Sequence, residues 1–165
     1  MLDEVLRSLE AYLRSTPQGE FLRHARWGWP IFESLHFVGM SVLLGTVGVF
    51  DLRLLGFARW IPIAALHRLI PLGISAFVLN AVTGFCFLSA TPDQYLFNLA
   101  FRWKLTFIML AGVNVMVFYA GVFRRLLESE PGGAPPLAAR IAGGVSLFAW
   151  IGVMSAGRLL TFFRP

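Results

Sequence analysis

Four long apolar stretches alternate with short polar segments along this chain of 165 residues. The stretches cover about residues 31–50, 69–90, 104–123 and 138–163. Each is long enough to cross the ~30 Å hydrocarbon core of a bilayer as a helix. Arginines, tryptophans and prolines gather at their ends, as is typical of residues that anchor helices at the headgroup level. The pattern predicts an all-α integral membrane protein, with residues 17–165 forming an antiparallel four-helix bundle.

Residues 1–16 follow a different pattern. Apolar side chains recur there at helical spacing, namely Leu2, Val5, Leu6, Leu9, Tyr12 and Leu13. Acidic and basic residues occupy the positions between them, which predicts an amphipathic helix lying on the membrane surface. Packing of this helix against a soluble domain of a partner protein is the alternative. Pro17 and Gly19 are expected to end it.

Composition supports the membrane assignment and excludes some partners. The chain is 57% hydrophobic and only 14% charged, whereas soluble domains carry about 25% charged residues. The net charge of +5 could suggest nucleic acid. However, the arginines lie at the ends of apolar stretches, where they meet lipid phosphates. We therefore expect no nucleic acid, and the predicted partners are the lipid bilayer and a second protein or further copies of this chain.

The chain offers few residues for catalysis or for binding a metal. A single cysteine, Cys86, excludes an intrachain disulfide and a thiolate cluster. Three histidines and one Glu-x-x-His motif, residues 33–36, are too few for a zinc, copper or di-iron site. No phosphate-binding glycine loop or catalytic triad is visible. The sequence thus predicts no metal site and no catalytic residues, and it favours a non-catalytic role over an enzyme.

One layer of ionisable residues lies near the start of the first predicted span. Glu33 and His36 are three residues apart and share a helix face. Lys104 and Arg158 fall at the same membrane depth on the third and fourth spans. Ionisable groups at such depths are costly, which makes these four the candidate site. Two interpretations are open: a cofactor-binding site for a haem, quinone or anionic group, or a structural layer of ion pairs.

Two asparagines form a second polar feature, deeper in the bilayer. Asn80 lies about 11 residues from one face and Asn114 about 10 from the other, so a rise of 1.5 Å per residue gives them similar depths. An inter-helix hydrogen bond is the usual role of such amides. We predict that Asn80 and Asn114 form a structural polar pair.

A haem shared by two histidines of this chain is disfavoured. His36 lies near the start of the first span, whereas His67 precedes the second span at the opposite face. About 20 Å along the bilayer normal separates them, so they cannot ligate one iron. The cofactor therefore stays unknown, with haem b or a quinone as the candidates.

Several motifs resemble an uncharacterised bacterial family of small four-span membrane proteins. They are the run 29–39 with its Glu-x-x-His, the Asp-Leu-Arg-Leu-Leu-Gly of residues 51–56, the Phe-Arg-Trp-Lys of residues 101–104, Asn114, and Ala156-Gly157-Arg158. The resemblance implies the fold and a bacterial cytoplasmic membrane, and it implies no activity. Family members commonly carry a histidine where this chain has Tyr119, which weakens a shared haem or metal role.

Three functional hypotheses follow. The first is a non-catalytic accessory or scaffold subunit of a larger membrane complex, such as an electron-transfer complex. The second is a redox module that binds haem or quinone around His36, and the third is a small proton-coupled transporter that uses Glu33. Residues 92–95 have the character of an exoplasmic loop and Arg124-Arg125 that of a cytoplasmic anchor. We accordingly expect both termini on the periplasmic side.

Overall fold

The computed structural model describes residues 2–127 and 133–163, which contain helices and no strand. Four helices in this part of the chain are long and apolar enough to cross a membrane. Their main segments are α3 (Gly28–Leu54), α5 (Ile70–Ala90), α7 (Leu99–Val117) and α9 (Leu137–Leu159). The all-α prediction and the presence of four membrane-capable helices are confirmed.

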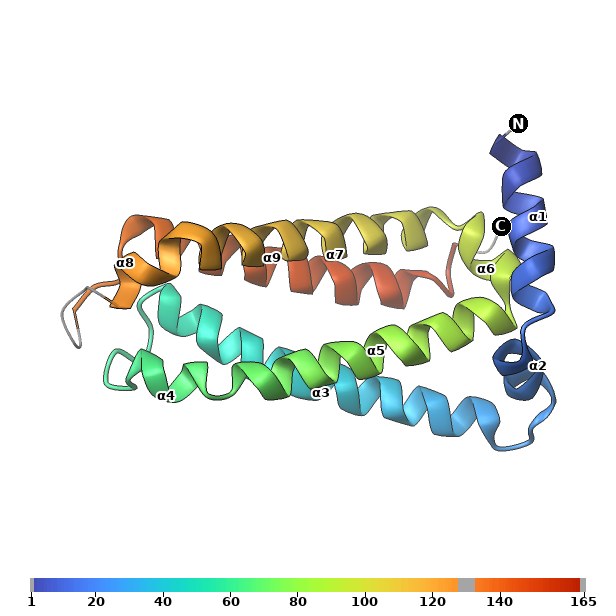
Figure 1. Cartoon of the computed structure of the whole chain (residues 1–165), viewed down its shortest axis with the longest axis horizontal. Helices are drawn as coiled ribbons and strands as arrows, with labels where there is room; N and C mark the ends of the chain where they lie inside the picture. Colours follow the sequence, from blue (N-terminus) through green and yellow to red (C-terminus); the bar gives the residue numbers. More distant parts are fainter. Residues whose placement is uncertain (1, 128–132, 164–165) are drawn as a thin grey trace.

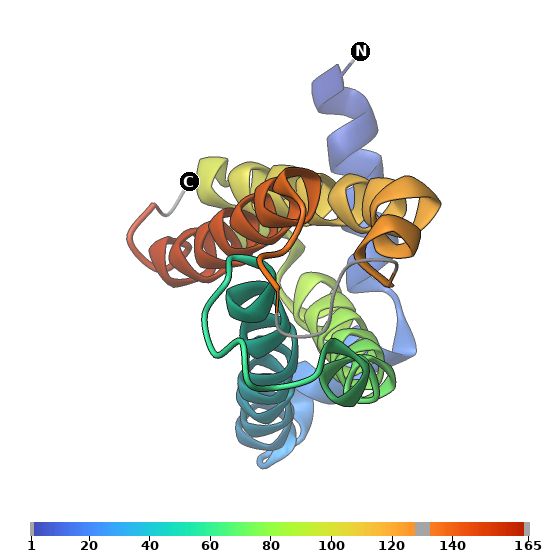
Figure 2. The same ribbon diagram turned by 90° about the vertical axis from the view of Figure 1, so that its left-hand side faces the viewer.

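The long helices pack as two pairs (Figure 1). α5 packs along α3, α7 packs along α9, and α3 and α9 form the main joint between the pairs. Within the described chain α5 and α7 make few or no contacts with each other. Figure 2 shows the two pairs end-on. Each long helix runs opposite to the one before it, so the first helix and the end of α9 lie at the same end of the molecule.

Two of the four long helices extend beyond the ends that the apolar pattern suggested, whereas α9 ends at Leu159, four residues before its expected end. α3 continues to Leu54, four residues past the expected end, and encloses Asp51 and Arg53 as buried residues. α7 continues through a π-helical turn, η1 (Phe118–Val122), into α8 (Phe123–Leu127). The short α4 (Ile63–His67) leads into α5. A carboxyl that was expected at a loop thus lies inside the bundle.

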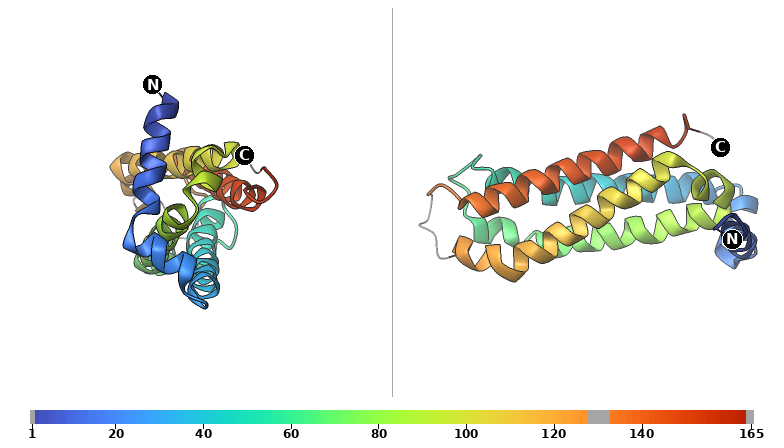
Figure 3. Two further views of the ribbon diagram at one scale, coloured as in Figure 1. Left: turned by 90° about the vertical axis from the view of Figure 1, so that its right-hand side faces the viewer. Right: turned by 90° about the horizontal axis from the view of Figure 1, so that it is seen from above.

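The N-terminal residues form two helices rather than one. α1 (Leu2–Arg14) runs across one end of the bundle, and Figure 3 shows it from that end. α2 (Pro17–His24) begins at the proline expected to break the helix, because proline is well suited to the first helical turn. Gly19 lies against α5, where an added Cβ would lie 2.5 Å from the Ser89 carbonyl oxygen. A close approach of α2 to the end of α5 therefore requires glycine.

Arg14 and Arg23 connect α1 and α2 to the rest of the bundle through hydrogen bonds and an ion pair. The Arg23 guanidinium donates to the carbonyl oxygens of Ser89 (3.2 Å) and Ala90 (3.1 Å) at the end of α5. It also donates to the Arg14 carbonyl oxygen at 2.6 Å. Arg14 in turn forms a 2.7 Å ion pair with Asp93 on α6 (Pro92–Leu96). Arg23 satisfies carbonyls that a helix end leaves unpaired.

Asn98 joins the start of α7 to the end of α9. Its side-chain oxygen accepts from the Ala100 amide at 2.9 Å and caps α7, while its amide donates to the carbonyl oxygens of Leu160 and Phe163. We expect Asn98→Ala to lower the free energy of unfolding by about 1–3 kcal/mol, because a helix cap is lost and the Leu160 and Phe163 carbonyl oxygens lose a donor. Thermal unfolding in detergent measures this. Gln94→Ala, at an exposed position, is the control, and an equal effect of both substitutions would refute the assignment.

Candidate functional site

His36 is held by a hydrogen bond between α3 and α5. Its Nδ1 lies 2.7 Å from the Thr83 hydroxyl oxygen, and its ring meets Phe87 edge-on at a centroid distance of 5.7 Å. The Thr83 hydroxyl lies 2.8 Å from the Leu79 carbonyl oxygen, to which it donates. Nδ1–H of His36 then donates to Thr83. His36 thus serves as a contact between two helices.

The other members of the polar layer have separate surroundings. Lys104 is half-buried beside Gly157 of α9. A Cβ added at Gly157 would lie 3.7 Å from the Nζ atom of Lys104. The Lys104 ammonium is also close enough to His36 to interact with it electrostatically. The Arg158 guanidinium lies over the Phe162 ring at 5.9 Å. Among the described residues, no salt bridge within 4.0 Å joins Glu33 to either cation. No hydrogen bond or salt bridge in the described chain joins these four side chains to one another.

Glu33 is exposed and lies near Tyr95, which follows the end of α5. Burial raises the pKa of the Tyr95 phenol, and the nearby Glu33 carboxylate raises it further. Both effects disfavour the phenolate, because burial costs a charge its hydration and a second negative charge repels it. Glu33 therefore belongs to the surface near α6 rather than to a pocket inside the bundle.

The two asparagines stabilise different helix pairs. The Asn114 amide donates to the Ala142 carbonyl oxygen at 3.0 Å and so joins α7 to α9. The Asn80 amide donates to the Ala76 carbonyl oxygen at 3.0 Å, and Asn80 packs against Gly39 of α3. Within the described chain no hydrogen bond connects Asn80 with Asn114. Their depths are similar, but the helices that carry them belong to different pairs.

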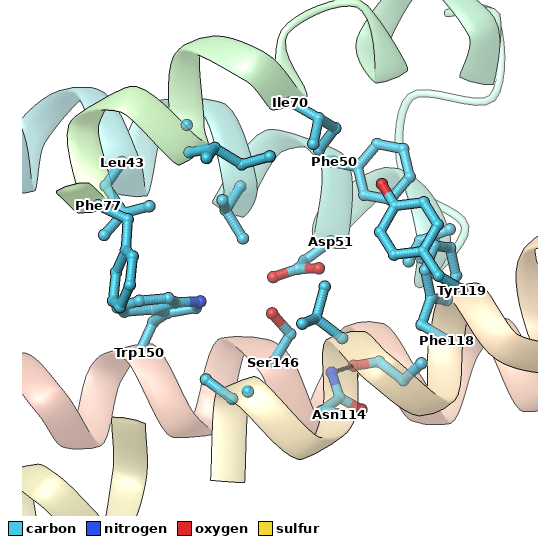
Figure 4. Close-up of a pocket in the computed structure, with 18 of the residues that line it drawn as sticks. Leu43, Phe50, Asp51, Ile70, Phe77, Asn114, Phe118, Tyr119, Ser146 and Trp150 are labelled. Atoms are coloured by element: carbon cyan, nitrogen blue, oxygen red, sulfur yellow. Dashed lines mark hydrogen bonds between the residues drawn. The ribbon is translucent and has the colours of Figure 1, made fainter. Parts of the chain in front are cut away.

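A cavity of about 420 Å³ lies between the two helix pairs. Figure 4 shows it with the side chains of its walls. α3, α5, α7, η1 and α9 all contribute to the lining, and most of the lining side chains are apolar. The polar exceptions are Asp51, Asn114, Tyr119 and Ser146.

The cavity opens on the side between α5 and α7. Lining residues from α3 and α9, such as Leu43 and Ala142, are buried. Those from α5 and α7 include strongly exposed ones, for example Ile74 (59% exposed) and Val115 (48% exposed). With the four apolar helices in a bilayer, this opening faces lipid.

Asp51 is the acidic group of the cavity wall. It is only 3% exposed, and its Oδ2 atom has no hydrogen-bond partner. The Ser146 hydroxyl of α9 faces the carboxyl (Figure 4). No lysine or arginine of the described residues forms a salt bridge with Asp51 within 4.0 Å. A buried carboxyl without a basic partner is costly, which marks it as a functional candidate.

Aromatic side chains form both ends of the cavity. Phe77 and Trp150 meet edge-on at 6.2 Å at one end, and Phe50 and Phe118 meet edge-on at 5.9 Å at the other. The π-helical turn η1 supplies Phe118 and the neighbouring Tyr119. Such turns recur at functional sites because they re-aim side chains that an α-helix would direct elsewhere.

His67 lies behind this aromatic end. Its Nε2 is 3.1 Å from the Tyr119 hydroxyl, and its ring stacks on Phe123 at 4.7 Å. It also approaches Phe50, with ring centroids 6.4 Å apart. Phe50 is fourteen residues beyond His36 on the same helix, so about 21 Å separates these levels at 1.5 Å per residue. His36 and His67 thus lie too far apart to share one iron, as the sequence suggested.

The sequence contained a signal for the cavity that the apolar pattern obscured. Leu43, Val47, Phe50 and Leu54 recur at intervals of three or four residues, and Asp51 falls on the same helix face. An acid at the edge of an apolar stretch is normally taken as the end of a span. Here the apolar face continues past the acid, which is the feature that indicates a buried carboxyl.

The fold and the cavity together define the class of this protein. In the described residues it is an all-helical chain with four membrane-capable helices and a cavity between the helix pairs that contains one buried acid. No known protein family, curated protein or solved structure shows significant similarity to the chain. Its function is therefore argued from the cavity.

Proposed function

We propose that this chain is a multi-pass protein of the bacterial cytoplasmic membrane that binds a small lipid-soluble molecule between its helix pairs. The proposal rests on the cavity. Its volume of about 420 Å³ lies within the ~300–1,000 Å³ range of ligand sites. Its walls are largely apolar with few polar groups, a combination that binds an apolar body and orients one polar end.

The position of the opening supports entry from the bilayer. A molecule dissolved in lipid reaches the gap between α5 and α7 without crossing water. Deeper in, Asp51 and Ser146 lie on α3 and α9, the helices that join the two pairs. A ligand that enters with its polar end first brings that end to the carboxyl, while its apolar part stays against Ile74 and Val115. This arrangement supports a binding site, because the lining is mostly apolar and its polar groups lie where they can orient one end of a ligand.

Filling the cavity is expected to abolish binding. Gly112 of α7 lines the cavity and has no atom within 4 Å of an added Cβ, so Gly112→Phe places a ring in the empty space. The neutral fluorophore N-phenyl-1-naphthylamine serves as the probe in lipid nanodiscs, with empty nanodiscs subtracted. We expect saturable fluorescence for the native chain and none for Gly112→Phe.

A matched control is available on α3. Gly45 also has no atom within 4 Å of an added Cβ, but it is exposed and does not line the cavity. Gly45→Phe is expected to bind the probe as the native chain does. The binding proposal is wrong if the native chain shows no saturable signal, or if Gly112→Phe and Gly45→Phe behave alike.

We further propose the membrane placement that the sequence suggested. α1 would lie on the membrane surface, where exposed side chains such as Val5 and Tyr12 reach the apolar boundary. Its Arg14–Asp93 ion pair fixes it across the end of the bundle. Both termini would then be periplasmic, with α8 at the cytoplasmic end. We also propose that the chain belongs to the uncharacterised four-span family that its motifs resemble, which would imply the same membrane location.

A role as an accessory subunit is a second proposal, favoured by α7. Only 6% of the most apolar window of the third span is buried within the chain. Its outer face presents Leu105, Met109 and Met116, which suit either lipid or a partner helix. Recovery of a larger complex, or of a homo-oligomer, in mild detergent would support this role. The contacts of His36 and Glu33 give the redox and transport hypotheses no comparable support.

A further inference from the structure

We propose that the molecule bound in the cavity is an amphipathic organic cation, an amine or quaternary ammonium with an apolar body, paired with the Asp51 carboxylate. This inference rests on the proposed function, namely that the cavity binds a lipid-soluble molecule. It goes further by assigning the charge of that molecule and the residue that recognises it.

The positive charge of the ligand is inferred from the absence of a basic partner for the buried Asp51 carboxyl in the described residues. The carboxyl is 3% exposed and its Oδ2 accepts no hydrogen bond. A buried charge is stable only when it is paired and hydrogen-bonded. The Ser146 hydroxyl faces the carboxyl, but it supplies no charge. A bound cation would provide both the missing charge and, for an amine, the missing donor.

The nearest arginine in sequence cannot take this role. Arg53 is buried two residues further along α3, and its guanidinium donates to the carbonyl oxygens of Ile61 (2.9 Å) and Arg59 (3.3 Å). These carbonyls lie in the connection that follows α3, and Arg53 does not line the cavity. Its buried Nη1 atom has no hydrogen-bond partner, and no salt bridge within 4.0 Å joins it to Asp51. None of the residues that line the cavity is basic. The site therefore has a negative group and no built-in counter-ion.

The aromatic ends of the cavity favour the same kind of ligand. Phe77 and Trp150 at one end, and Phe50, Phe118 and Tyr119 at the other, surround the level of Asp51. Aromatic faces carry partial negative charge and attract cations, most strongly where water is excluded. Carboxylates and phosphates would meet one acid and several ring faces, and would be repelled. Anionic lipids and fatty acids are thus poor candidates.

A quinone fits the polar groups less well than a cation does. Its carbonyl oxygens need hydrogen-bond donors, and the Asn114 amide already donates to the Ala142 carbonyl oxygen. The Ser146 hydroxyl faces Asp51, so a quinone oxygen at this position would face an acceptor. The remaining donors of the lining, the Tyr119 hydroxyl and the Trp150 indole N–H, lie at the two aromatic ends and not beside the acid. The polar end of the cavity offers an acceptor, so it selects a ligand that donates or is positively charged.

Two ions of the same shape and opposite charge test the assignment. The probes are tetraphenylphosphonium and tetraphenylborate, measured as saturable binding to the native chain in nanodiscs with empty nanodiscs subtracted. We expect tetraphenylphosphonium to bind and tetraphenylborate not to bind. Asp51→Asn is expected to weaken phosphonium binding at least ~10-fold, because a desolvated charge pair loses one member. Asp51→Glu keeps the charge and is expected to retain binding.

A second measurement uses the native chain and needs no variant to fold. Dicyclohexylcarbodiimide labels protonated carboxyls within membranes, and mass spectrometry locates the label. Tetraphenylphosphonium, but not tetraphenylborate, is expected to protect Asp51, while the exposed Glu33 stays unprotected and serves as an internal control. Protection by both ions, or by neither, would contradict the cation assignment.

The outcomes separate this inference from the binding proposal. If phenylnaphthylamine binds and Gly112→Phe blocks it, the cavity is a binding site whatever its charge preference. Equal binding of the two ions, or phosphonium binding that Asp51→Asn leaves unchanged, then overturns only the cation assignment. If phenylnaphthylamine gives no saturable signal with the native chain, the binding proposal fails, and the cation assignment that rests on it fails too.

Discussion

Gly143→Leu is expected to lower the free energy of unfolding by about 3 kcal/mol or more, the largest destabilisation among the substitutions proposed. Overpacking of a core usually costs ~1–3 kcal/mol, and here the added side chain would also collide with backbone atoms. An added Cβ at Gly143 would lie 2.9 Å from both the Asp51 carbonyl oxygen and the Leu54 Cβ. Neither atom can rotate away. α9 would have to move off α3, and these helices form the main joint between the two pairs.

The neighbouring glycine provides the control for this prediction. An added Cβ at Gly144 meets only the Leu55 Cδ2 atom, at 3.8 Å, which is ordinary van der Waals contact. Both variants replace a glycine in the middle of α9 by leucine, so helix propensity changes equally. Unfolding in mixed micelles with increasing denaturing detergent measures the difference. Equal stability of the Gly143→Leu and Gly144→Leu variants would show that the α3–α9 joint lies elsewhere.

The apolar pattern was sufficient to predict the helical class and the four membrane-capable helices. Runs of about 20 apolar residues leave a chain little choice in lipid, because only a helix satisfies its own backbone groups. The end of α3 was harder to predict. Asp51 and Arg53 would normally mark a membrane boundary, but tertiary contacts bury both. The carbonyl oxygens that accept from Arg53 belong to Ile61 and Arg59, which are close only after folding.

The position of a residue along its helix could be predicted from the sequence, whereas the neighbour that its side chain faces could not. Glu33 and His36 were grouped by a shared helix face, whereas Lys104 and Arg158 were added by depth alone. In the structure His36 contacts Thr83 and Arg158 lies over Phe162, contacts that depth could not predict. A shift of one residue turns a side chain by 100°, which is enough to move it from one neighbour to another.

The cavity could not be predicted because it depends on how the pairs diverge. Close contacts at small residues set that geometry: Gly143 lets α9 approach α3, and Gly39 and Gly73 let α5 approach α3. α5 and α7 have no comparable contact and stay apart. The same separation explains why Asn80 and Asn114 are not bonded to each other: the Asn80 amide donates to Ala76 on its own helix, and the Asn114 amide donates to Ala142 on α9.

Asp51→Leu is expected to raise the free energy of unfolding by roughly 1–3 kcal/mol, because replacing a buried unpaired acid by an apolar side chain removes an uncompensated desolvation cost. The direction is informative, since most core substitutions destabilise. Thermal and denaturing-detergent unfolding of the ligand-free protein measure it. Asp93→Leu is the control: it removes an acid that has a 2.7 Å ion pair with Arg14 at the surface, so it is expected to give no gain.

The two possible roles of the buried acid give opposite results in this measurement. If Asp51 stabilised the α3–α9 joint through Ser146, the Asp51→Leu variant would be less stable than the native chain, and the cavity acid would be structural. A gain in stability together with a loss of phosphonium binding would mean that the chain retains a destabilising group for its function. Proteins commonly accept such a cost at binding sites, because the group that recognises a ligand is unsatisfied until the ligand arrives.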